Sequence, residues 1–567
     1  MIIYPLYAKL LNSETYNLCF RYYNEEFKLA PKLFNFSRSK TERFSITLQK
    51  IQSSIISNII NKKVNCSVKS SPLDIQIFYN NDIDINTLTL EQALQSKDSN
   101  IIIGEIHYRI IMNAPYIKIL KLPKKPMVGC PFFPYIEVNE DDVDVQYFWM
   151  KPHIEKEHTN ELYNGDIMYK DYDESKWTKV SENLIYNPNK NEVNLKIGLL
   201  CIPSKNNLRG QSEFIVSNLI SKEPLNNILQ KRHKLTIAPV SFPEIRICSY
   251  NILADLYAKS DYSKTTLFPY CPPFALKYEY RQNIIFNEII NYNADLICLQ
   301  EVDKKLFNTH LNIGLSQYGY SGLSLFKGDT VAEGCALFYK NSKFDLISKY
   351  DISIPNAIQA NQELYKTIQQ YPRLKENIMS KKSVFQVTLL KCKYNLTDDV
   401  ICIANTHLYF LPTSPHIRLI QITSCLRYLQ NVLAQYCQNN TKSKRPRVII
   451  CGDFNSSPQT DLYQFLTTKC LTKDATSWPK GDDPEAFEGF DLSHNFELYS
   501  ACGQPEYTNF VPGFQKCIDY VFVEKKKFEI EQIIPFPSRK DIEKYTALPN
   551  EELGSDHLAL VCDVKIT

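Results

Sequence analysis

The sequence predicts an α/β fold for residues 245–567 and a β-rich domain before them. After residue 245, short apolar runs bounded by polar or Gly residues alternate with a helical pattern of apolar positions, which is typical of buried strands connected by helices. Before about residue 222, apolar and polar residues alternate at every second position, which is typical of half-buried strands in an antiparallel sheet. We therefore expect two dissimilar halves.

The first half contains two clear alternating segments. Phe44, Ile46 and Leu48 alternate with polar residues, and so do the apolar residues of 193–199. Because a strand places successive side chains on opposite faces, this pattern predicts a strand at each position.

Prolines mark the junction between the halves. Residues 223–244 hold three prolines around the basic stretch Lys231–Lys234, a composition typical of an interdomain connection. We therefore expect a β-rich accessory domain over 1–222, a linker over 223–244 and an α/β domain over 245–567.

The second half contains six apolar runs that are predicted to be buried strands. They cover residues 245–251, 296–302, 335–340, 400–408, 447–455 and 517–523. A helix is predicted over 417–433, because five apolar residues recur there at spacings of three and four, namely Leu419, Ile422, Leu426, Leu429 and Leu433.

The composition excludes several classes of protein. Hydrophobic residues make up 44% of the 567 and charged residues 22%, so the chain is neither disordered nor fibrous. The net charge of +3 is too small for a protein that holds nucleic acid mainly through a broad basic surface. The 17 cysteines contain no C-x-x-C pair, which favours reduced thiols over a zinc cluster or a disulfide framework. No apolar run is long enough to predict a membrane-spanning helix.

Polar residues stand at the ends of the predicted strands, where α/β sheets bind ligands. These residues are Asn251, Glu301, His407, Asp453, Asn455, Asp519, Asp556 and His557. One such residue alone is more often a turn former or cap. Several together are costly to bury unless they share a ligand or a metal.

The residue types indicate a specific chemistry. Glu301, Asp453 and Asn455 offer hard oxygen ligands without a thiolate, which suits Mg²⁺ or Mn²⁺ better than zinc. Together with histidines, such a centre fits phosphodiester hydrolysis. A hydrogen bond from His557 to Asp519 would fix the tautomer of that imidazole and favour its protonated form.

At these residues the sequence resembles the endonuclease/exonuclease/phosphatase superfamily, which has the DNase I-like fold. The motifs are SYNILAD (249–255), LQEVD (299–303), NTHL (405–408), GDFNSSP (452–458), DY (519–520) and SDH (555–557). Together with YRQN (280–283), they are similar to the deadenylase branch, which includes nocturnin. The resemblance implies a four-layer α/β sandwich, two packed mixed sheets flanked by helices, as the catalytic domain.

The resemblance also implies a role for each motif residue. Glu301 is the main Mg²⁺ ligand, Asp453 acts at the water or the metal, and Asn455 contacts phosphate or metal. Asn251 belongs to the metal and phosphate shell, and Asp556 supports the site. His407 and His557 flank the scissile phosphate, and Asp519 orients His557. Whether Asp453 or His557 removes the proton from water stays open.

The implied activity is that of a Mg²⁺-dependent 3'-to-5' exoribonuclease. It would hydrolyse 2',5'-oligoadenylate and 3',5'-linked poly(A) and release AMP. The alternatives are a nocturnin-like or other superfamily nuclease or phosphatase with another substrate, and a non-catalytic RNA-binding module. No membrane and no obligate protein partner is expected. The resemblance implies the mitochondrial matrix, and the cytoplasm is the alternative because the chain shows no transit peptide.

Contacts to substrate are less well defined by the sequence. Arg281 on an early helix could bind a phosphate or be a solvated helix charge. Four aromatic residues near the motifs could stack on adenines or belong to the core, namely Tyr270, Tyr409, Tyr507 and Phe510. The basic clusters 442–445 and 525–527 are expected to be solvated faces, with RNA guidance as the alternative.

Overall fold

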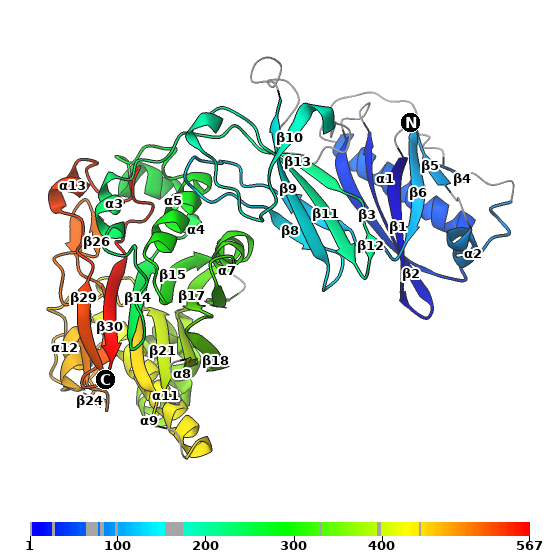
Figure 1. Cartoon of the computed structure of the whole chain (residues 1–567). Helices are drawn as coiled ribbons and strands as arrows, with labels where there is room; N and C mark the ends of the chain where they lie inside the picture. The colour runs from blue at the N-terminus through cyan, green and yellow to red at the C-terminus, as the bar shows by residue number, and fades with distance from the viewer. Residues whose placement is uncertain are drawn as a thin grey trace. The chain divides into compact units, whose positions relative to one another are not determined.

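The computed structural model contains two compact units, Met1–Lys222 and Glu223–Thr567, which are each described by themselves (Figure 1). The structure describes residues 3–24, 29–63, 77–79, 84–96, 100–153, 174–328, 331–393, 399–441, 444–481 and 483–567.

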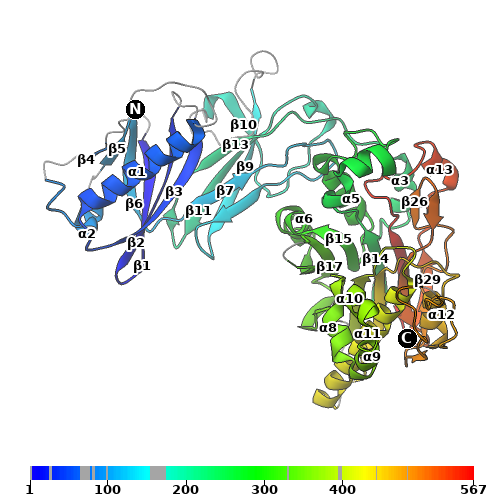
Figure 2. The ribbon, with the colours of Figure 1, turned by 180° about the vertical axis from the view of Figure 1, so that it is seen from behind.

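The first unit contains a six-stranded sheet in the order β3-β2-β1-β6-β5-β4. The strands are β1 (Ile3–Asn12), β2 (Thr15–Asn24), β3 (Leu29–Ser39), β4 (Ile77–Tyr79), β5 (Asn100–Ile103) and β6 (Ile106–Met112). Helix α1 (Phe44–Lys63) lies across one face (Figure 2), and α2 (Leu90–Gln95) is beside it.

Helix α1 contradicts the strand that the alternation at Phe44, Ile46 and Leu48 predicts. Phe44 and Leu48 are buried against the sheet, while Ile46 is 40% exposed. The buried positions continue with Ile51, Ile55 and Ile59, which is the spacing of one face of a helix. A window of six residues was too short to separate the two periods.

A second sheet of the first unit has the order β10-β9-β11-β12, with β13 also paired to β11. Its strands are β9 (Asp144–Pro152), β10 (Trp177–Ser181), β11 (Gly198–Lys205), β12 (Leu208–Arg209) and β13 (Glu213–Val216), beside the hairpin β7 (Ile117–Lys121) and β8 (Tyr135–Val138), with 3₁₀ turns η1 (Glu174–Lys176) and η2 (Lys190–Glu192). The strand predicted over 193–199 is wrong for most of its length, because β11 begins only at Gly198.

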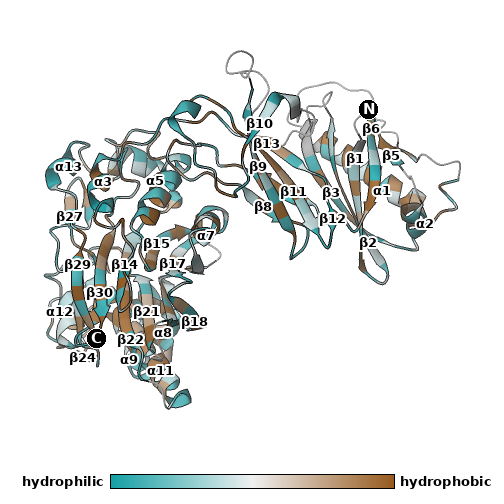
Figure 3. Cartoon of the chain, viewed as in Figure 1, coloured by the Kyte–Doolittle hydropathy of each residue, from teal (hydrophilic) through white to brown (hydrophobic). Residues whose placement is uncertain are grey.

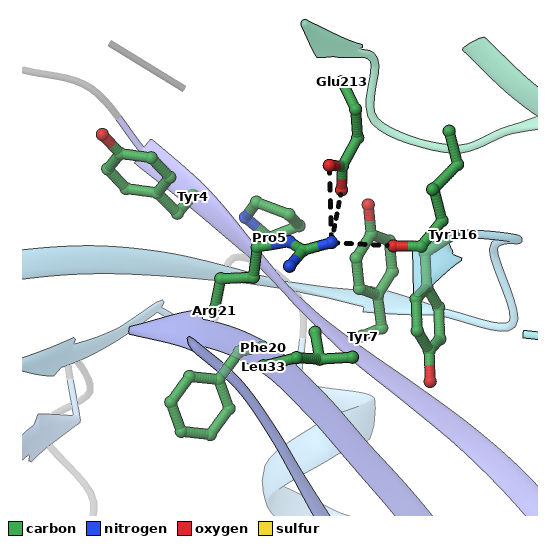
Figure 4. Close-up of a pocket in the computed structure, with 9 residues that line it drawn as sticks. Tyr4, Pro5, Tyr7, Phe20, Arg21, Leu33, Tyr116 and Glu213 are labelled. Carbon is green, nitrogen blue, oxygen red and sulfur yellow. Dashed lines mark hydrogen bonds and ion pairs between the residues drawn. The ribbon is translucent and has the colours of Figure 1, made fainter. Parts of the chain in front are cut away.

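A buried ion pair joins the two sheets of the first unit. Arg21 of β2 lies 3.5 Å from Glu213 of β13 (Figure 4). It also donates to the carbonyl oxygens of Ile117 and Lys118. Because the guanidinium and the carboxylate pair with each other and backbone carbonyls also accept from the arginine, the pair is a structural link between the sheets.

The second unit has two large sheets, ordered β16-β17-β15-β14-β30-β29 and β18-β20-β21-β22-β28-β25, with β19 beside β20. The first contains β14 (Glu244–Asn251), β15 (Leu296–Asp303), β16 (Tyr320–Phe326), β17 (Glu333–Lys340), β29 (Phe528–Ile533) and β30 (Leu560–Ile566). The second contains β18 (Phe344–Lys349), β19 (Ile352–Ser353), β20 (Val384–Cys392), β21 (Val400–His407), β22 (Arg447–Asp453), β25 (Leu498–Ser500) and β28 (Asp519–Glu524).

The two sheets pack face to face and helices cover their outer faces. One buried cluster contains Ile247 and Leu296 of the first sheet and Ile403 and Ile449 of the second. Strand β22 carries a hydrophobic run (Figure 3). Helices α8 (Ile354–Ala360), α9 (Gln362–Ile368), α10 (Pro372–Ser380), α11 (Pro415–Asn439) and α12 (Asp461–Thr468) cover the second sheet. On the outer face of the first sheet lies α5 (Tyr278–Asn291). The predicted four-layer sandwich is thereby confirmed.

Short elements complete the second unit. They are α3 (Asn227–His233), α4 (Asp255–Ala258), η3 (Ser263–Leu267), α6 (Lys304–Leu306), η4 (Phe307–Leu311), α7 (Asn312–Ser316), β23 (Cys470–Leu471), β24 (Leu492–Ser493), β26 (Asn509–Val511), β27 (Phe514–Lys516) and α13 (Arg539–Glu543). Within the described residues, no helix is both long and apolar enough to cross a membrane.

The segment 223–244, expected as a linker, packs into the second unit instead. Arg232 of α3 is buried and donates to the hydroxyl of Tyr292 at 2.6 Å and to the carbonyl of Ala559 at 2.7 Å. The basic stretch was expected to belong to an interdomain connection, but Arg232 is a buried anchor of the second unit because tertiary partners satisfy its donors.

Candidate active site

Strand register brings three of the predicted site residues side by side. Strands β21 and β22 are parallel with His407 opposite Asp453, and β22 is antiparallel to β28 with Asp453 opposite Asp519. All three residues stand at one end of their strands and are buried. The second sheet therefore delivers an imidazole and two carboxylates to a single edge.

The first sheet contributes Asn251, at the end of β14, and Glu301, near the end of β15. The side-chain amide of Asn251 donates to Glu301 Oε1 at 3.1 Å and to Asp453 Oδ2 at 3.0 Å. One neutral donor thus joins carboxylates from both sheets, and the site lies where the ends of the two sheets meet.

The backbone around Glu301 is unusual. Its φ is +55°, in the left-handed region that a residue with a Cβ seldom adopts, and the pairing of β15 with β17 is irregular between Leu299 and Val302. Such strain persists where the surroundings fix it, often at functional sites. Here the backbone N–H of Ala254 binds Glu301 Oε2 at 3.0 Å, which holds the carboxylate at the site.

The two bridged carboxyls are difficult to ionise. Burial raises the pKa of Glu301 to about 7, with further contributions from Glu333 and Asp556. Burial and the neighbouring Asp519 raise the pKa of Asp453 to about 7 as well. Both shifts have the same physical origin, which is negative charge crowded into a volume that water does not reach.

This crowding fits a divalent cation. Five carboxylates gather at the centre, namely Glu301, Glu333, Asp453, Asp519 and Asp556, and the positive charges of four groups act on them, namely Lys327, His557, Arg418 and Arg281. Oxygens of Asp453 and Asp519 and a ring nitrogen of His557 all lie within 4.8 Å of one another. The donors are mostly hard oxygens, the set that Mg²⁺ and Mn²⁺ prefer.

His557 and Asp519 form a hydrogen-bonded pair. The Nδ1 atom of His557 lies 2.8 Å from Asp519 Oδ2, and Nε2 lies 3.7 Å from Asp453 Oδ2. Burial alone would lower the pKa of His557, but Asp519, Asp556 and Asp453 outweigh it and hold that pKa well above its usual value. The imidazole is therefore protonated near neutral pH and presents Nε2–H toward Asp453.

His407 has the opposite character. Its Nε2 lies 3.6 Å from Asp453 Oδ2 and its Nδ1 lies 3.9 Å from Glu301 Oε1. Burial, Lys327 and His557 hold the pKa of His407 well below its usual value. The site thus combines one neutral and one cationic imidazole, which can play different roles toward a phosphate.

Asn455 and Asp556 border this group. Asn455 donates its backbone N–H to Asp453 Oδ1 at 2.9 Å and its side-chain amide to the carbonyl of Leu408 at 3.1 Å. Asp556 is half-buried and accepts a 3.4 Å hydrogen bond from Asn509. The structure brings both residues to the site, as the sequence predicts.

Arg281 differs from its predicted role as a phosphate ligand. The side chain is 3% exposed, and its guanidinium donates to the backbone carbonyls of Ile252, Leu253 and Gly554. Since these donors are used inside the protein, we correct its role to that of a brace. It ties the segment after Asn251 to the segment before Asp556.

Two residues of the site were missed by the sequence reasoning. The hydroxyl of Thr508 donates to Asp519 Oδ2 at 2.6 Å, the same oxygen that binds His557. Lys327 pairs with Glu333, and its charge also acts on Glu301 and His407. Neither stands at the end of a predicted strand.

The aromatic residues divide between core and surface. Tyr507 and Phe510 are buried, and the Tyr507 hydroxyl donates to the carbonyl of Pro537. Tyr270 donates to the carbonyl of Leu548. Tyr409, two residues after His407, is half-buried with the Lys381 ammonium 4.5 Å from its ring centroid. Tyr507 and Phe510 therefore belong to the core and are not available to stack on adenines.

The fold and this edge of carboxylates, amides and imidazoles define a class of metallohydrolase. The model of the endonuclease/exonuclease/phosphatase family matches residues 248–375 and 438–557, which include Asn251, Glu301, Asp453 and His557. The chain belongs to this family and is a hydrolase.

Among individual proteins, the chain is 36% identical to 2',5'-phosphodiesterase 12 of Homo sapiens over 469 residues, which are 82% of this chain and 75% of that protein. It is 29% identical over 348 residues to the CCR4-Not complex 3'-5'-exoribonuclease subunit Ccr4 of Schizosaccharomyces pombe, covering 56% and 49% of the two chains. The structure of ANGEL2, a 2',3'-cyclic phosphatase, in complex with adenosine-2',3'-vanadate matches with 23% identity and a TM-score of 0.47, covering 57% of this chain and 96% of that one.

Proposed function

We propose that this protein is a Mg²⁺-dependent 3'-to-5' exoribonuclease that hydrolyses 2',5'-linked oligoadenylate and 3',5'-linked poly(A) and releases AMP. The observation that carries the proposal is the Asn251 amide, which joins Glu301 and Asp453 at the edge where His557 and Asp519 form their pair. The similarity to a 2',5'-phosphodiesterase and to a 3'-5'-exoribonuclease supports the choice of substrate.

Glu301 and Asp453 would hold the cation, with Asn455 beside them. When bound there, Mg²⁺ or Mn²⁺ would neutralise charge on the phosphoryl oxygens in the transition state. It would also lower the pKa of both carboxyls, which burial now raises to about 7, because a nearby cation favours their ionised forms.

The protonation states of the two groups favour Asp453 over His557 as the general base. His557 is already protonated, since its pKa lies well above the usual value, and it cannot accept a second proton at that ring. The bound cation would lower the pKa of Asp453 from about 7, so this carboxylate is ionised near neutral pH and can accept a proton from water. His557 then donates a hydrogen bond to a phosphoryl oxygen, and Asp519 keeps its ring in place.

The reaction balances with these groups. Water attacks phosphorus and its proton passes to Asp453, while the bond from phosphorus to the ribose oxygen of the preceding nucleotide breaks. The released 2'- or 3'-oxygen takes up a proton from solvent water, Asp453 returns its proton to solvent, and the terminal nucleotide leaves as AMP.

A direct assay tests the proposal. Purified protein is incubated with 2',5'- and 3',5'-linked oligoadenylates and with abasic duplex DNA, with Mg²⁺ or with EDTA, and AMP is measured. We expect AMP from both oligoadenylates only with the metal. Cleavage of the DNA alone, or tight binding of poly(A) without turnover, would overturn the assignment.

We also propose the mitochondrial matrix as its location, on the resemblance alone. Fractionation of cells that express the complete natural gene product tests this, and recovery in the cytosol would contradict it.

A further inference from the structure

A run of three lysines and an arginine distant from it in the sequence line one groove of the second unit. Lys525, Lys526 and Lys527 form the turn between β28 and β29, and Arg445 precedes β22. The groove has a volume of about 510 Å³, and Leu433 of α11 is among its apolar lining. Folding thus concentrates in one concavity the positive charge that the sequence scatters.

The three lysines carry the free charge of this groove. All three are exposed, and among the described residues none of their ammonium groups forms an ion pair. Arg445, in contrast, lies 2.7 Å from Glu524. The other acidic group that lines the groove, Glu497, lies 3.4 Å from Lys469. Because both carboxylates have cationic partners, the lysines leave the groove with a net positive potential.

The groove lies far from the metal site. Strand β28 begins at Asp519 in the active site and ends at Glu524, so its length separates the lysine turn from the catalytic edge by roughly 20 Å. The backbone N–H of the terminal residue Thr567 donates to the carbonyl of Lys527 at 3.2 Å. In Figure 1 the C-terminus therefore marks the groove end of the unit.

The lining indicates what can bind. Phe496 is 1% exposed and lies under the guanidinium of Arg445, 5.6 Å from the ring centroid, so it offers no open face for base stacking. Mobile ammonium groups around a concave surface suit phosphates, which positively charged side chains bind without regard to base sequence.

We propose that this groove binds the phosphate backbone of single-stranded RNA, upstream of the 3' end that occupies the active site. The inference rests on the proposed exoribonuclease function, because only a polyanionic chain with its end in the metal site can reach both places. It assigns the groove to retention of long substrates and gives it no part in the chemical step.

A triple variant tests the proposal. Lys525→Gln, Lys526→Gln and Lys527→Gln are combined, and the control combines Lys366→Gln, Lys473→Gln and Lys480→Gln, three exposed lysines elsewhere in the unit. Rates are measured on triadenylate, on long poly(A), and on a U-rich RNA with a 3' oligo(A) tail. We expect the KM of both long RNAs to rise by about tenfold or more in the groove variant only.

Salt dependence gives a second readout. For single-stranded nucleic acid, each phosphate contact contributes about −0.7 to the slope of log affinity against log salt concentration. Removing three lysine contacts should therefore make the slope for long RNA shallower by about 2. Equal KM values and equal salt slopes in the groove variant and the control variant would overturn the proposal. Binding of an acidic peptide to the groove, without any binding of RNA there, would also overturn it. Failure of the wild-type protein to hydrolyse any RNA would instead contradict the proposed function.

Discussion

The two ends of strands β14 and β15 bury charge in opposite ways. At the end where β14 begins, Arg246 donates to both oxygens of Asp563, at 2.7 and 2.9 Å, and Lys343 lies 2.7 Å from Asp295. At the other end, Glu301 shares a single neutral amide with Asp453.

This contrast between the two ends distinguishes buried charges that stabilise the fold from buried charges that are arranged to bind a ligand. A buried pair whose partners are both present can be close to neutral for stability. A group of buried carboxylates with too few cations is costly, and it persists where a ligand supplies the missing charge. The same sheets thus carry a structural pair at one end and a candidate cation site at the other.

The largest effect is expected from Asp453→Asn. The amide keeps the shape but cannot accept a proton, so AMP release should fall by about 10³-fold or more. The metal-free variant should also melt at a higher temperature than wild type, because one uncompensated carboxyl is gone. Steady-state kinetics and calorimetry measure the two effects. A folded variant with full activity would contradict the assignment of the site.

The matching change at the opposite end is Asp563→Asn. It leaves Arg246 buried without its charged partner, so the free energy of unfolding should fall by about 3–5 kcal/mol. Urea denaturation measures the loss, and the kcat of the protein that stays folded should not change. A loss of activity without a loss of stability would contradict the claim that the Arg246–Asp563 pair is purely structural.

The stability of the metal-free protein should depend on pH. Glu301 and Asp453 have pKa values of about 7 in the folded state, above the ordinary 4.5 and 3.8, so the folded state binds their protons more tightly than the unfolded chain does. Their contribution to stability is complete below about pH 4 and is lost as the pH rises through about 7. Added Mg²⁺ should restore the stability at high pH. Thermal melts from pH 5 to 8 measure it, and a Mg²⁺ effect that vanished as the pH rose would contradict this expectation.

A smaller effect is expected from Thr508→Val. Its hydroxyl binds the same Asp519 oxygen as His557. Its loss should lower kcat by about tenfold, which is less than the roughly 10²–10⁴-fold that loss of a general acid or base costs, with little change in KM. Thr508→Ser keeps the hydroxyl and should restore kcat. If serine and valine gave the same rate, packing would explain the effect and the positioning role would be wrong.

The sequence predicted the strands of the second unit better than those of the first. Strands such as β22 are buried on both faces and read as continuous apolar runs, so their ends and the polar residues there are visible in one dimension. Helix α1 was missed because its first turns hold the apolar residues Phe44, Ile46 and Leu48 at alternate positions, and only the pattern through Ile59 reveals the helical period.

The missed parts of the site depend on contacts between distant segments. Thr508 reaches Asp519 through a turn of the chain, and Arg281 is satisfied by the carbonyls of Leu253 and Gly554. Neither position carries a periodic pattern, so residue type alone could not show whether these side chains face a ligand or the protein.

The most direct test of the uncompensated site is metal binding without substrate. Mn²⁺ is titrated into the wild-type protein and the Asp453→Asn variant by calorimetry near pH 7, in two buffers of different ionisation heat so that released protons are counted. We predict binding to the wild-type protein with release of protons, because the two carboxyls have pKa values of about 7, and much weaker binding to the variant. Equal affinity in the two proteins, or no binding to the wild type, would contradict the account.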